Sequence, residues 1–389
     1  MVDSVPLVDL KAQFATIRGE VEAQIAEVLG SQQFVLGPKV KEFEEKAAAA
    51  FEVKHAIGVA SGSDALLLSL MALGVGPGTS VITTSYSFFA SCSCVARLGA
   101  TPIFCDIEPD TYNLDPKLVA GILEKDCERT ASGIRHRPTD TVVRAIVPVH
   151  LYGQCADMTA FLELAKRYHL AIVEDAAQAI GARHRGRLAG AMGSLGCFSF
   201  FPSKNLGAYG DGGMVTAQDD GLAERVRVLR EHGSPRRYVH EFIGINSRLD
   251  SLQAGVLLAK LPHLAEWNAG RRQRAERYAQ AFAGLPQVKT PVTRPENECI
   301  FHQYVIRAED RDRVAEHLRE RKVGYAIYYP APLHTQQCFA YLGYKRGDCP
   351  VAEQASRETL ALPIYPELTQ EQQDYVVASV RECYLASVR

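Results

Sequence analysis

The apolar positions near the start of the chain repeat every three or four residues, as on one face of an amphipathic helix. These positions are Leu10, Phe14, Ile17, Val21, Ile25 and Val28. The repeat predicts a helix that ends near Gly30 and packs its apolar face on the rest of the protein.

Short runs rich in β-branched and aromatic residues follow and alternate with helical stretches. The runs cover residues 80–84, 101–107, 143–150, 171–174 and 197–200, and the helical stretches include 64–73 and 157–168. Several runs are apolar throughout, which is typical of strands buried on both faces. The alternation predicts an α/β fold with a mostly parallel central sheet and helices on both of its faces.

The pattern changes after about residue 250. A helical stretch at 252–282 leads to shorter segments at 301–308, 312–321 and 325–329 and to a C-terminal helix from Thr369. This order predicts a smaller α+β domain. We therefore expect a large α/β domain over residues 1–250, which includes the N-terminal helix, and a small C-terminal domain over residues 251–389.

Composition narrows the function classes. The 389 residues are 47% hydrophobic and 23% charged, and 43 Lys and Arg face 45 Asp and Glu for a net charge of −2. This balance favours a globular protein and gives no general attraction to nucleic acid or to an anionic membrane. No stretch has the length of a membrane span, so we expect a cytoplasmic, unanchored protein.

Neither the cysteines nor the histidines predict a metal centre. The ten cysteines are scattered without a C-x-x-C pair. The histidines at 150, 232, 302 and 334 lack the i, i+4 spacing of helical zinc ligands. We expect no metal site and no disulfide scaffold.

The most informative local feature is a lysine in a glycine-rich turn. Residues 199–213 read SFFPSKNLGAYGDGG, so Lys204 follows an apolar strand and precedes four glycines. In one interpretation Lys204 is a solvated loop residue. In the other it is an amine nucleophile that forms a Schiff base with a carbonyl cofactor.

Two further segments carry groups that a cofactor could use. Residues 171–180 (AIVEDAAQAI) place Asp175 at the end of a strand, where α/β proteins bind ligands, although Asp175 could instead cap a helix. Residues 59–67 (VASGSDALL) read as the start of a helix, which can hold a phosphate on free N–H groups or can be capped by Ser61 or Ser63.

These groups match the needs of pyridoxal 5′-phosphate when they are taken together. That cofactor requires a lysine for its aldehyde, a carboxylate for its pyridine nitrogen and a site for its phosphate. A flat side chain against the ring could come from Tyr86, Phe88 or Phe89.

The chain resembles the sugar aminotransferase family often called DegT/DnrJ/StrS, within the aspartate-aminotransferase-like fold of pyridoxal phosphate enzymes (fold type I). The resemblance extends over nearly the whole length. Its motifs are PLVDLKAQ, SGSDAL, TYNLDP, PVHLYGQCADM, EDAAQA, SFFPSKNLGAYGDGG, INSRLDSLQA, PAPLH and LALPIYPEL.

The resemblance implies a role for each matching residue. Lys204 corresponds to the Schiff-base lysine and Asp175 to the partner of the pyridine nitrogen, and these two are the catalytic residues. The remaining cofactor ligands are Gln178 for the ring hydroxyl, Phe88 for the ring face, and Gly62, Ser63 and Ser199 for the phosphate.

The resemblance also implies a homodimer with shared active sites. Asn246 matches an asparagine that reaches the phosphate of the neighbouring subunit's cofactor. Arg248 is a candidate for binding an anion of the nucleotide or the donor, or else it pairs with Asp250 at the surface. Tyr329 matches a substrate-pocket residue, whereas Tyr328 stands where close relatives often have a histidine.

The implied reaction is transfer of an amino group from L-glutamate to a nucleotide-linked keto sugar. The motifs are most similar to those of enzymes that aminate C3 of UDP-linked 2-acetamido-3-keto sugars. A C4-keto sugar or a dTDP-linked 3-keto-6-deoxy sugar remains an alternative. A non-catalytic regulatory protein is a distant one. Lys204 argues against the family's dehydratases, and the G-x-x-G-x-G spacing after it argues against a nicotinamide dehydrogenase.

Overall fold

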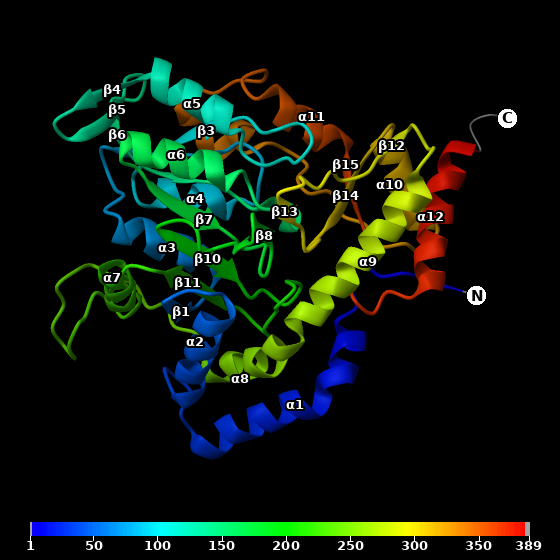
Figure 1. Cartoon of the computed structure of the whole chain (residues 1–389), viewed down its shortest axis with the longest axis horizontal. Coiled ribbons are helices and arrows are strands. Elements are labelled where there is room, and N and C mark those ends of the chain that lie inside the picture. The colour runs from blue at the N-terminus through cyan, green and yellow to red at the C-terminus, as the bar shows by residue number, and fades with distance from the viewer. Residues whose placement is uncertain (1, 386–389) are drawn as a thin grey trace.

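A β-sheet forms the centre of the protein in a computed structural model, which describes residues 2–385 (Figure 1). The main strands are β1 (His55–Val59), β2 (Thr79–Thr84), β3 (Thr101–Cys105), β6 (Thr141–Val147), β7 (Ala171–Asp175), β10 (Leu195–Ser199) and β11 (Gly213–Ala217). Their order across the sheet is β1-β11-β10-β7-β6-β2-β3. A hairpin of β4 (Cys127–Thr130) and β5 (Gly133–His136) extends the sheet beside β6.

The sheet is mostly parallel, as the sequence predicts. Strands β10, β7, β6, β2 and β3 run parallel to their neighbours in that row. Strand β11 runs antiparallel to both β1 and β10, so β1 has the same direction as β10. Six strands therefore point their carboxyl ends toward the same edge of the sheet.

Helices cover both faces of the sheet and bury both (Figure 1). One layer contains α2 (Pro38–Ala50), α5 (Pro116–Lys125), α6 (Met158–Tyr168) and α8 (Ser251–Lys260). The other contains α3 (Gly62–Ala72), α4 (Ala90–Arg97) and α7 (Asp220–Arg230). Adjacent strand residues alternate between the two cores, so Ile172 packs with the first layer and Val173 with the second. This alternation explains why the strands are apolar throughout.

Short polar residues set the ends of several helices. Asp9 accepts hydrogen bonds from the N–H groups of Lys11 and Ala12 and so caps α1 (Leu10–Ser31). Asp157 caps α6 in the same way, and that helix ends at His169, which adopts a left-handed conformation. Helix α1 has the predicted length, and its buried face packs on α8.

The C-terminal part has its own small sheet and core. Its main elements are α9 (Leu264–Phe282), β12 (Val288–Lys289), β14 (Tyr304–Ala308), α10 (Arg311–Glu320), α11 (Pro350–Glu358), β15 (Thr359–Leu362) and α12 (Gln370–Leu385). Strands β12, β14 and β15 pair antiparallel. Helices α9, α10 and α12 pack with β14 and β15 in one buried cluster.

Short elements complete the structure. They are β8 (Arg183–His184), β9 (Arg187–Leu188) and β13 (Asn297–Glu298), which form a second small sheet, and the 3-10 helices Leu151–Gly153, Leu261–His263, Leu333–Thr335 and Gln337–Leu342. None of the described helices is long and apolar enough to cross a membrane.

Two features bear on the expected division at residue 250, which stays a prediction. Helix α8 follows that position, yet it packs on α1 and α2 beside the large sheet. Near the other end of the chain, Val5 bridges Val323 and is buried in the C-terminal cluster. The chain therefore connects the two parts both before α1 and at the start of α9.

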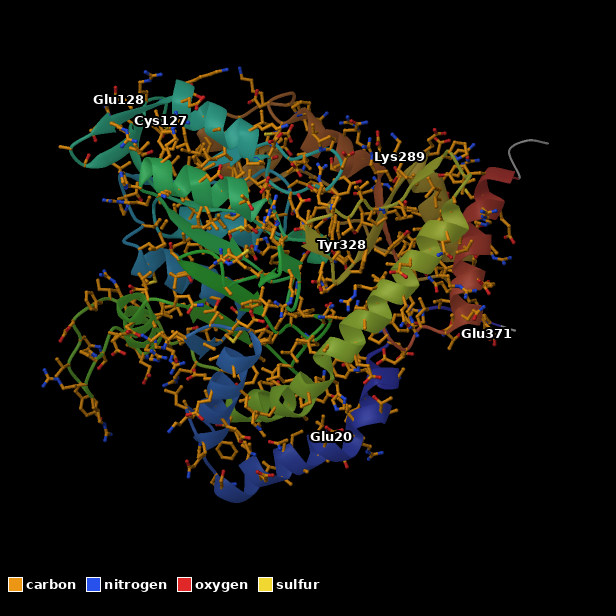
Figure 2. The ribbon with its side chains drawn as sticks, viewed as in Figure 1. Glu20, Cys127, Glu128, Lys289, Tyr328 and Glu371 are labelled. Carbon is orange, nitrogen blue, oxygen red and sulfur yellow. The ribbon has the colours of Figure 1, made fainter. Side chains whose placement is uncertain are left out.

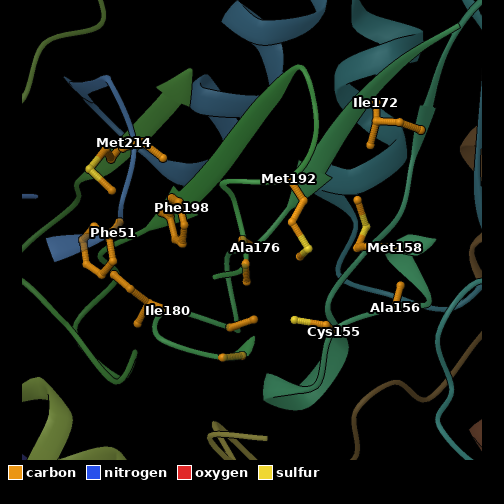
Figure 3. Close-up of a cluster of buried hydrophobic side chains, with 14 of the residues drawn as sticks. Phe51, Cys155, Ala156, Met158, Ile172, Ala176, Ile180, Met192, Phe198 and Met214 are labelled. Atoms are coloured by element: carbon orange, nitrogen blue, oxygen red, sulfur yellow. The ribbon is translucent and has the colours of Figure 1, made fainter. Parts of the chain in front are cut away.

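Phe198 on β10 tests how strongly the fold depends on the core beneath the sheet. Its fully buried ring stacks on Phe51 with 5.8 Å between ring centroids (Figure 3). Phe198→Ala should lower the free energy of unfolding by about 3–5 kcal/mol, because it removes a large buried side chain and leaves a cavity. Tyr341→Ala is the control, since Tyr341 is 67% exposed. Urea denaturation followed by circular dichroism measures both, and equal midpoints would contradict the prediction.

Candidate active site

A cavity of about 730 Å³ lies where the carboxyl ends of the strands face the C-terminal part. Asp175 ends β7 and Ser199 ends β10, and both line the cavity. Tyr328 and Tyr329 line it from the C-terminal part. Figure 2 shows Tyr328 in the middle of the molecule, between the large sheet and the C-terminal elements. Ligands of α/β proteins bind at this edge of a parallel sheet.

Lys204 reaches the cavity from a tight loop after β10. The loop turns on a hydrogen bond from the Lys204 N–H to the Phe201 carbonyl, at 2.8 Å. Gly207 is needed in this turn, since a Cβ there would lie 2.3 Å from the Pro202 carbonyl oxygen. The Lys204 amine has no hydrogen-bond partner among the described residues. Burial lowers its pKa to about 8, although the negative charge of Asp175 opposes this shift.

The carboxylate of Asp175 is buried and receives two hydrogen bonds. The Ser91 hydroxyl donates to Oδ2 at 2.7 Å, and the Ala177 N–H donates to Oδ1 at 3.2 Å. Burial raises the pKa of Asp175 above its ordinary value, while the bonds from Ser91 and Ala177 and the nearby Lys204 act in the opposite direction. A turn rather than a helix follows β7, so the capping interpretation of Asp175 is wrong.

Glu174 precedes Asp175 and makes its contacts away from the cavity. It accepts hydrogen bonds from His150 Nε2 and from the N–H groups of Gly190, Met192 and Gly193. His150 Nδ1 in turn accepts the Ala156 N–H, so the imidazole proton is on Nε2. Burial raises the pKa of Glu174, but these donors outweigh it and the net shift is downward.

Gln178 and Tyr329 form a hydrogen-bonded pair in the cavity wall. Gln178 Nε2 donates to the Tyr329 hydroxyl at 2.9 Å, and its Oε1 accepts the Tyr152 N–H at 2.8 Å. Burial raises the pKa of Tyr329. Because the Tyr329 oxygen accepts from Gln178, its own proton is free to bind another acceptor.

The start of α3 forms a further wall of the cavity. Ser61 caps the helix by accepting the Asp64 N–H at 3.1 Å. The N–H groups of Gly62 and Ser63, in the first turn, have no partner within the described chain and line the cavity. Ser199 lies against them, since a Cβ on Gly62 would be 2.6 Å from the Ser199 Cβ.

The aromatic candidates separate into two groups. Phe88 and Phe89 line the cavity and are partly exposed, at 57% and 44%. Tyr86 is instead buried, where its hydroxyl donates to the Tyr328 carbonyl at 2.7 Å and accepts the Tyr329 N–H. Tyr86 therefore supports the wall from behind, which leaves Phe88 and Phe89 as the candidates for the flat side chain against a ring.

Two predicted residues lie outside the cavity of a single chain. Asn246 is exposed and bridges Glu231, and Arg248 is half-buried. Neither lines the cavity. Arg248 makes no ion pair with Asp250 in the part of the chain that the structure describes. The roles predicted for both residues stay predictions.

The structure also places at the site residues that the sequence analysis did not select. Ser91 contacts Asp175, and its spacing of four residues from Ser87, with which it also hydrogen-bonds, is the available signal in the sequence. His302 lines the cavity about 100 residues beyond Lys204 in the sequence, where no local pattern marks it. Burial and the nearby Lys204 lower its pKa well below the usual value, so His302 is neutral. Residues 2–385 contain no group of three or more side chains that could hold a metal ion.

Three relatives and one solved structure are similar to this chain over nearly its whole length. A pleiotropic regulatory protein of Geobacillus stearothermophilus is 47% identical over 98% of this chain and 99% of its own. A dTDP-3-amino-3,4,6-trideoxy-alpha-D-glucose transaminase of Streptomyces venezuelae is 45% identical over 97% and 96%. A UDP-N-acetyl-3-dehydro-alpha-D-glucosamine 3-aminotransferase of Acidithiobacillus ferrooxidans is 42% identical over 97% of both chains.

The crystal structure of S. venezuelae DesV matches this fold with a TM-score of 0.91, at 45% identity over 98% of both chains. The model of the DegT/DnrJ/EryC1/StrS aminotransferase family matches residues 15–381, which include every cavity residue named above. With its fold, its lysine loop and its full-length relatives in agreement, the chain belongs to this family and is a pyridoxal 5′-phosphate-dependent aminotransferase.

Proposed function

We propose that the protein transfers an amino group from L-glutamate to C3 of a nucleotide-linked 3-keto sugar. The observation that carries the proposal is the convergence of Lys204, Asp175 and the start of α3 on one cavity, in a chain of an aminotransferase family. The product is a 3-amino sugar nucleotide that enters polysaccharide, lipid A or glycoside synthesis.

The residues at one end of the cavity fit the phosphate and the aldehyde of the cofactor. The unpartnered N–H groups of Gly62 and Ser63 and the hydroxyl of Ser199 would hold the phosphate at the positive end of α3. A Cβ at position 62 would fill this cradle because it would collide with Ser199. The free amine of Lys204 would hold the aldehyde.

The other groups would hold the ring. Asp175 would face the ring nitrogen and keep a proton on it, Gln178 would bind the ring hydroxyl, and Phe88 would lie against the flat face. When bound, pyridoxal phosphate supplies an electron-poor ring that accepts the electron pair released at the substrate carbon.

Lys204 would also move the proton of the reaction. Its pKa of about 8 lies close to neutral pH, so its amine can take a proton at one carbon and return it at another. Partial burial in the cavity limits the access of water to this proton. The free proton of Tyr329 would bind an oxygen of the sugar, with Gln178 holding the phenol in place.

We further propose a homodimer in which Asn246 completes the site of the neighbouring subunit. The segment before it exposes four large apolar side chains, Tyr238, Val239, Phe242 and Ile243, and such a patch is costly on a monomer. Arg248, two residues beyond Asn246, would bind an anion of the donor or the nucleotide.

The substrate proposal draws on the names of the relatives. The Streptomyces and Acidithiobacillus relatives are both named for a 3-amino or 3-dehydro sugar, which supports C3 over C4. Together with the motif resemblance, the second name supports a UDP-linked 2-acetamido-3-keto sugar. The nine cysteines from Cys92 to Cys349 are free thiols, and Cys338 is the exposed one among them, which suits the reducing cytoplasm that we propose as the protein's location.

Two other candidates have an observation in their favour. The 45% identical relative is named for a dTDP-linked sugar, so a dTDP-linked 3-keto-6-deoxy sugar is the second candidate substrate. The 47% identical relative is named a regulatory protein. The intact set of Lys204, Asp175 and Gln178 favours catalysis over a purely regulatory role.

Lys204 gives a prediction about pH. The neutral amine is the nucleophile, and a pKa of about 8 makes it neutral about two pH units below an ordinary lysine. The rate at which the cofactor-free protein gains the near-visible absorbance of bound pyridoxal phosphate should therefore rise as the pH passes about 8. A rise centred near the ordinary lysine value would contradict it. Lys204→Ala should gain no such band and lose transamination more than about a thousandfold, whereas Lys166→Ala on the surface of α6 should match wild type.

The shared site predicts that two inactive variants complement each other. In a mixture of Lys204→Ala and Asn246→Ala, hybrid dimers would pair the intact Lys204 of one subunit with the intact Asn246 of the other. Unfolding and refolding the mixture should restore about a quarter of wild-type activity, since half of the dimers are hybrids with one good site. Lys204→Ala mixed with Asp175→Ala is the matched control and should restore none. No gain in the first mixture would contradict a site that is shared through Asn246.

A half-reaction tests the substrate. The protein is first loaded with an amino group from glutamate, and the return of the original absorbance is then timed with three sugars. We expect a UDP-linked 2-acetamido-3-keto sugar to react at least about tenfold faster than a dTDP-linked 3-keto-6-deoxy or a dTDP-linked 4-keto sugar. A faster dTDP-linked 3-keto sugar would favour the second candidate, and failure of all three would reopen the regulatory role.

A further inference from the structure

Two buried hydroxyl groups form a chain that ends on the carboxylate of Asp175. Ser91 lies in the first turn of α4 and Ser87 in the bend just before that helix, with 2.9 Å between their oxygens. Ser91 continues the chain to Asp175 Oδ2 at 2.7 Å. Ser87, Ser91 and Asp175 are only 3%, 1% and 4% exposed. Ser87 and Asp175 both border the cavity.

The direction of the hydrogen bonds from Ser87 to Ser91 and from Ser91 to Asp175 follows from the ionised state of the carboxylate. An ionised carboxylate can only accept, so the single proton of Ser91 is donated to Asp175. Ser91 therefore has only an oxygen left for Ser87, and Ser87 must donate to it. A hydroxyl that itself accepts a hydrogen bond is a better donor, so Ser87 strengthens the contact of Ser91 with Asp175.

We propose that Ser91, supported by Ser87, is a positioning residue that orients Asp175 and holds its negative charge against the ring nitrogen of the cofactor. The inference rests on the proposed role of Asp175 and adds two residues to it. Oδ1 is held by the Ala177 N–H, so the hydroxyl chain controls the other oxygen of the same carboxylate.

Hydrogen bonds have to stabilise the negative charge of Asp175, because the charged groups near it do not do so at every pH. Burial favours the neutral acid, and the nearby titratable groups are Lys204 after β10, His150 after β6, Tyr329 of the C-terminal part, Cys94 on α4 and Cys197 on β10. Of these, Lys204 is the cation beside the cavity, and its amine becomes neutral above about pH 8. Loss of the Ser91 hydroxyl would therefore shift the pKa of Asp175 further upward.

A higher proton affinity at Asp175 has a measurable consequence at the ring. The carboxylate and the ring nitrogen would compete for one proton, so the ring nitrogen should lose part of its proton when Ser91 is removed. Nitrogen-15 NMR of bound pyridoxal phosphate labelled at the ring nitrogen reads this proton directly, without turnover. Titration of the cofactor-free protein with pyridoxal phosphate gives the affinity independently.

We expect the ring-nitrogen signal of Ser91→Ala to move toward that of the unprotonated ring, with pyridoxal phosphate bound about tenfold more weakly. Ser87→Ala keeps the Ser91 contact and should shift the signal less, in the same direction. Ser91→Thr keeps the hydroxyl and should restore the wild-type signal. Ser93→Ala removes a hydroxyl from the same helix that does not contact Asp175, and should match wild type in both measurements.

The controls separate this inference from the proposed function. If Ser91→Ala and Ser87→Ala both match Ser93→Ala in signal and affinity, the hydroxyl chain has no such role and the inference is overturned. If instead the wild-type ring nitrogen is unprotonated, or Asp175→Asn leaves its signal unchanged, the proposed role of Asp175 itself fails. Should Ser91→Ala not fold, as judged by circular dichroism, the shift in Ser87→Ala decides the outcome.

Discussion

A buried carboxylate at the end of β7 is the constraint around which the cavity is organised. Burial of an ion is costly unless the protein supplies donors or a counter-charge. The groups that offset the burial of Asp175 come from four segments: Ser91 from α4, Ala177 from the turn after β7, Lys204 from the loop after β10, and His150 after β6. One charged group is thereby stabilised by groups from separate parts of the sequence.

The adjacent residue, Glu174, is a buried carboxylate with a structural role and offers a comparison with Asp175. Glu174 points to the opposite face and accepts four hydrogen bonds, and its pKa falls although it is fully buried. Asp175 accepts two, and its pKa rises. Two adjacent residues of one strand thus have opposite shifts, because strand geometry sends their side chains to different surroundings. Because Asp175 accepts fewer hydrogen bonds than Glu174, its carboxylate can accept one from a further donor.

The sequence predicts the parts of this arrangement that depend on local pattern. The apolar runs indicate strands buried on both faces, and the motifs place Asp175 at the end of one strand and Lys204 just beyond another. Contacts between distant segments are not visible in such patterns. Strand β11 runs antiparallel to both β1 and β10, and Ser91 contacts Asp175 although the two are 84 positions apart in the sequence.

Other features depend on groups that no local pattern reveals. Tyr86 and Phe88 are both aromatic residues of the same segment. The Tyr86 hydroxyl, however, hydrogen-bonds to the backbone of Tyr328 and Tyr329, and the Tyr86 side chain is buried there. Asn246 and Arg248 lie outside the cavity of the described chain, so their predicted roles depend on the homodimer that we propose.

The two connections between the large sheet and the C-terminal part limit how these parts can move. The chain leaves the C-terminal cluster after Val5, passes through α1 and later returns through α9, whose long axis runs between the two parts (Figure 1). Buried side chains join the same two parts beside the cavity, since Tyr86 and Tyr152 share one cluster with Val305 and Ala361. The cavity has walls from both parts, with Lys204 on one and Tyr329 on the other. The separation of these two walls is therefore set by packed side chains as well as by the two chain connections.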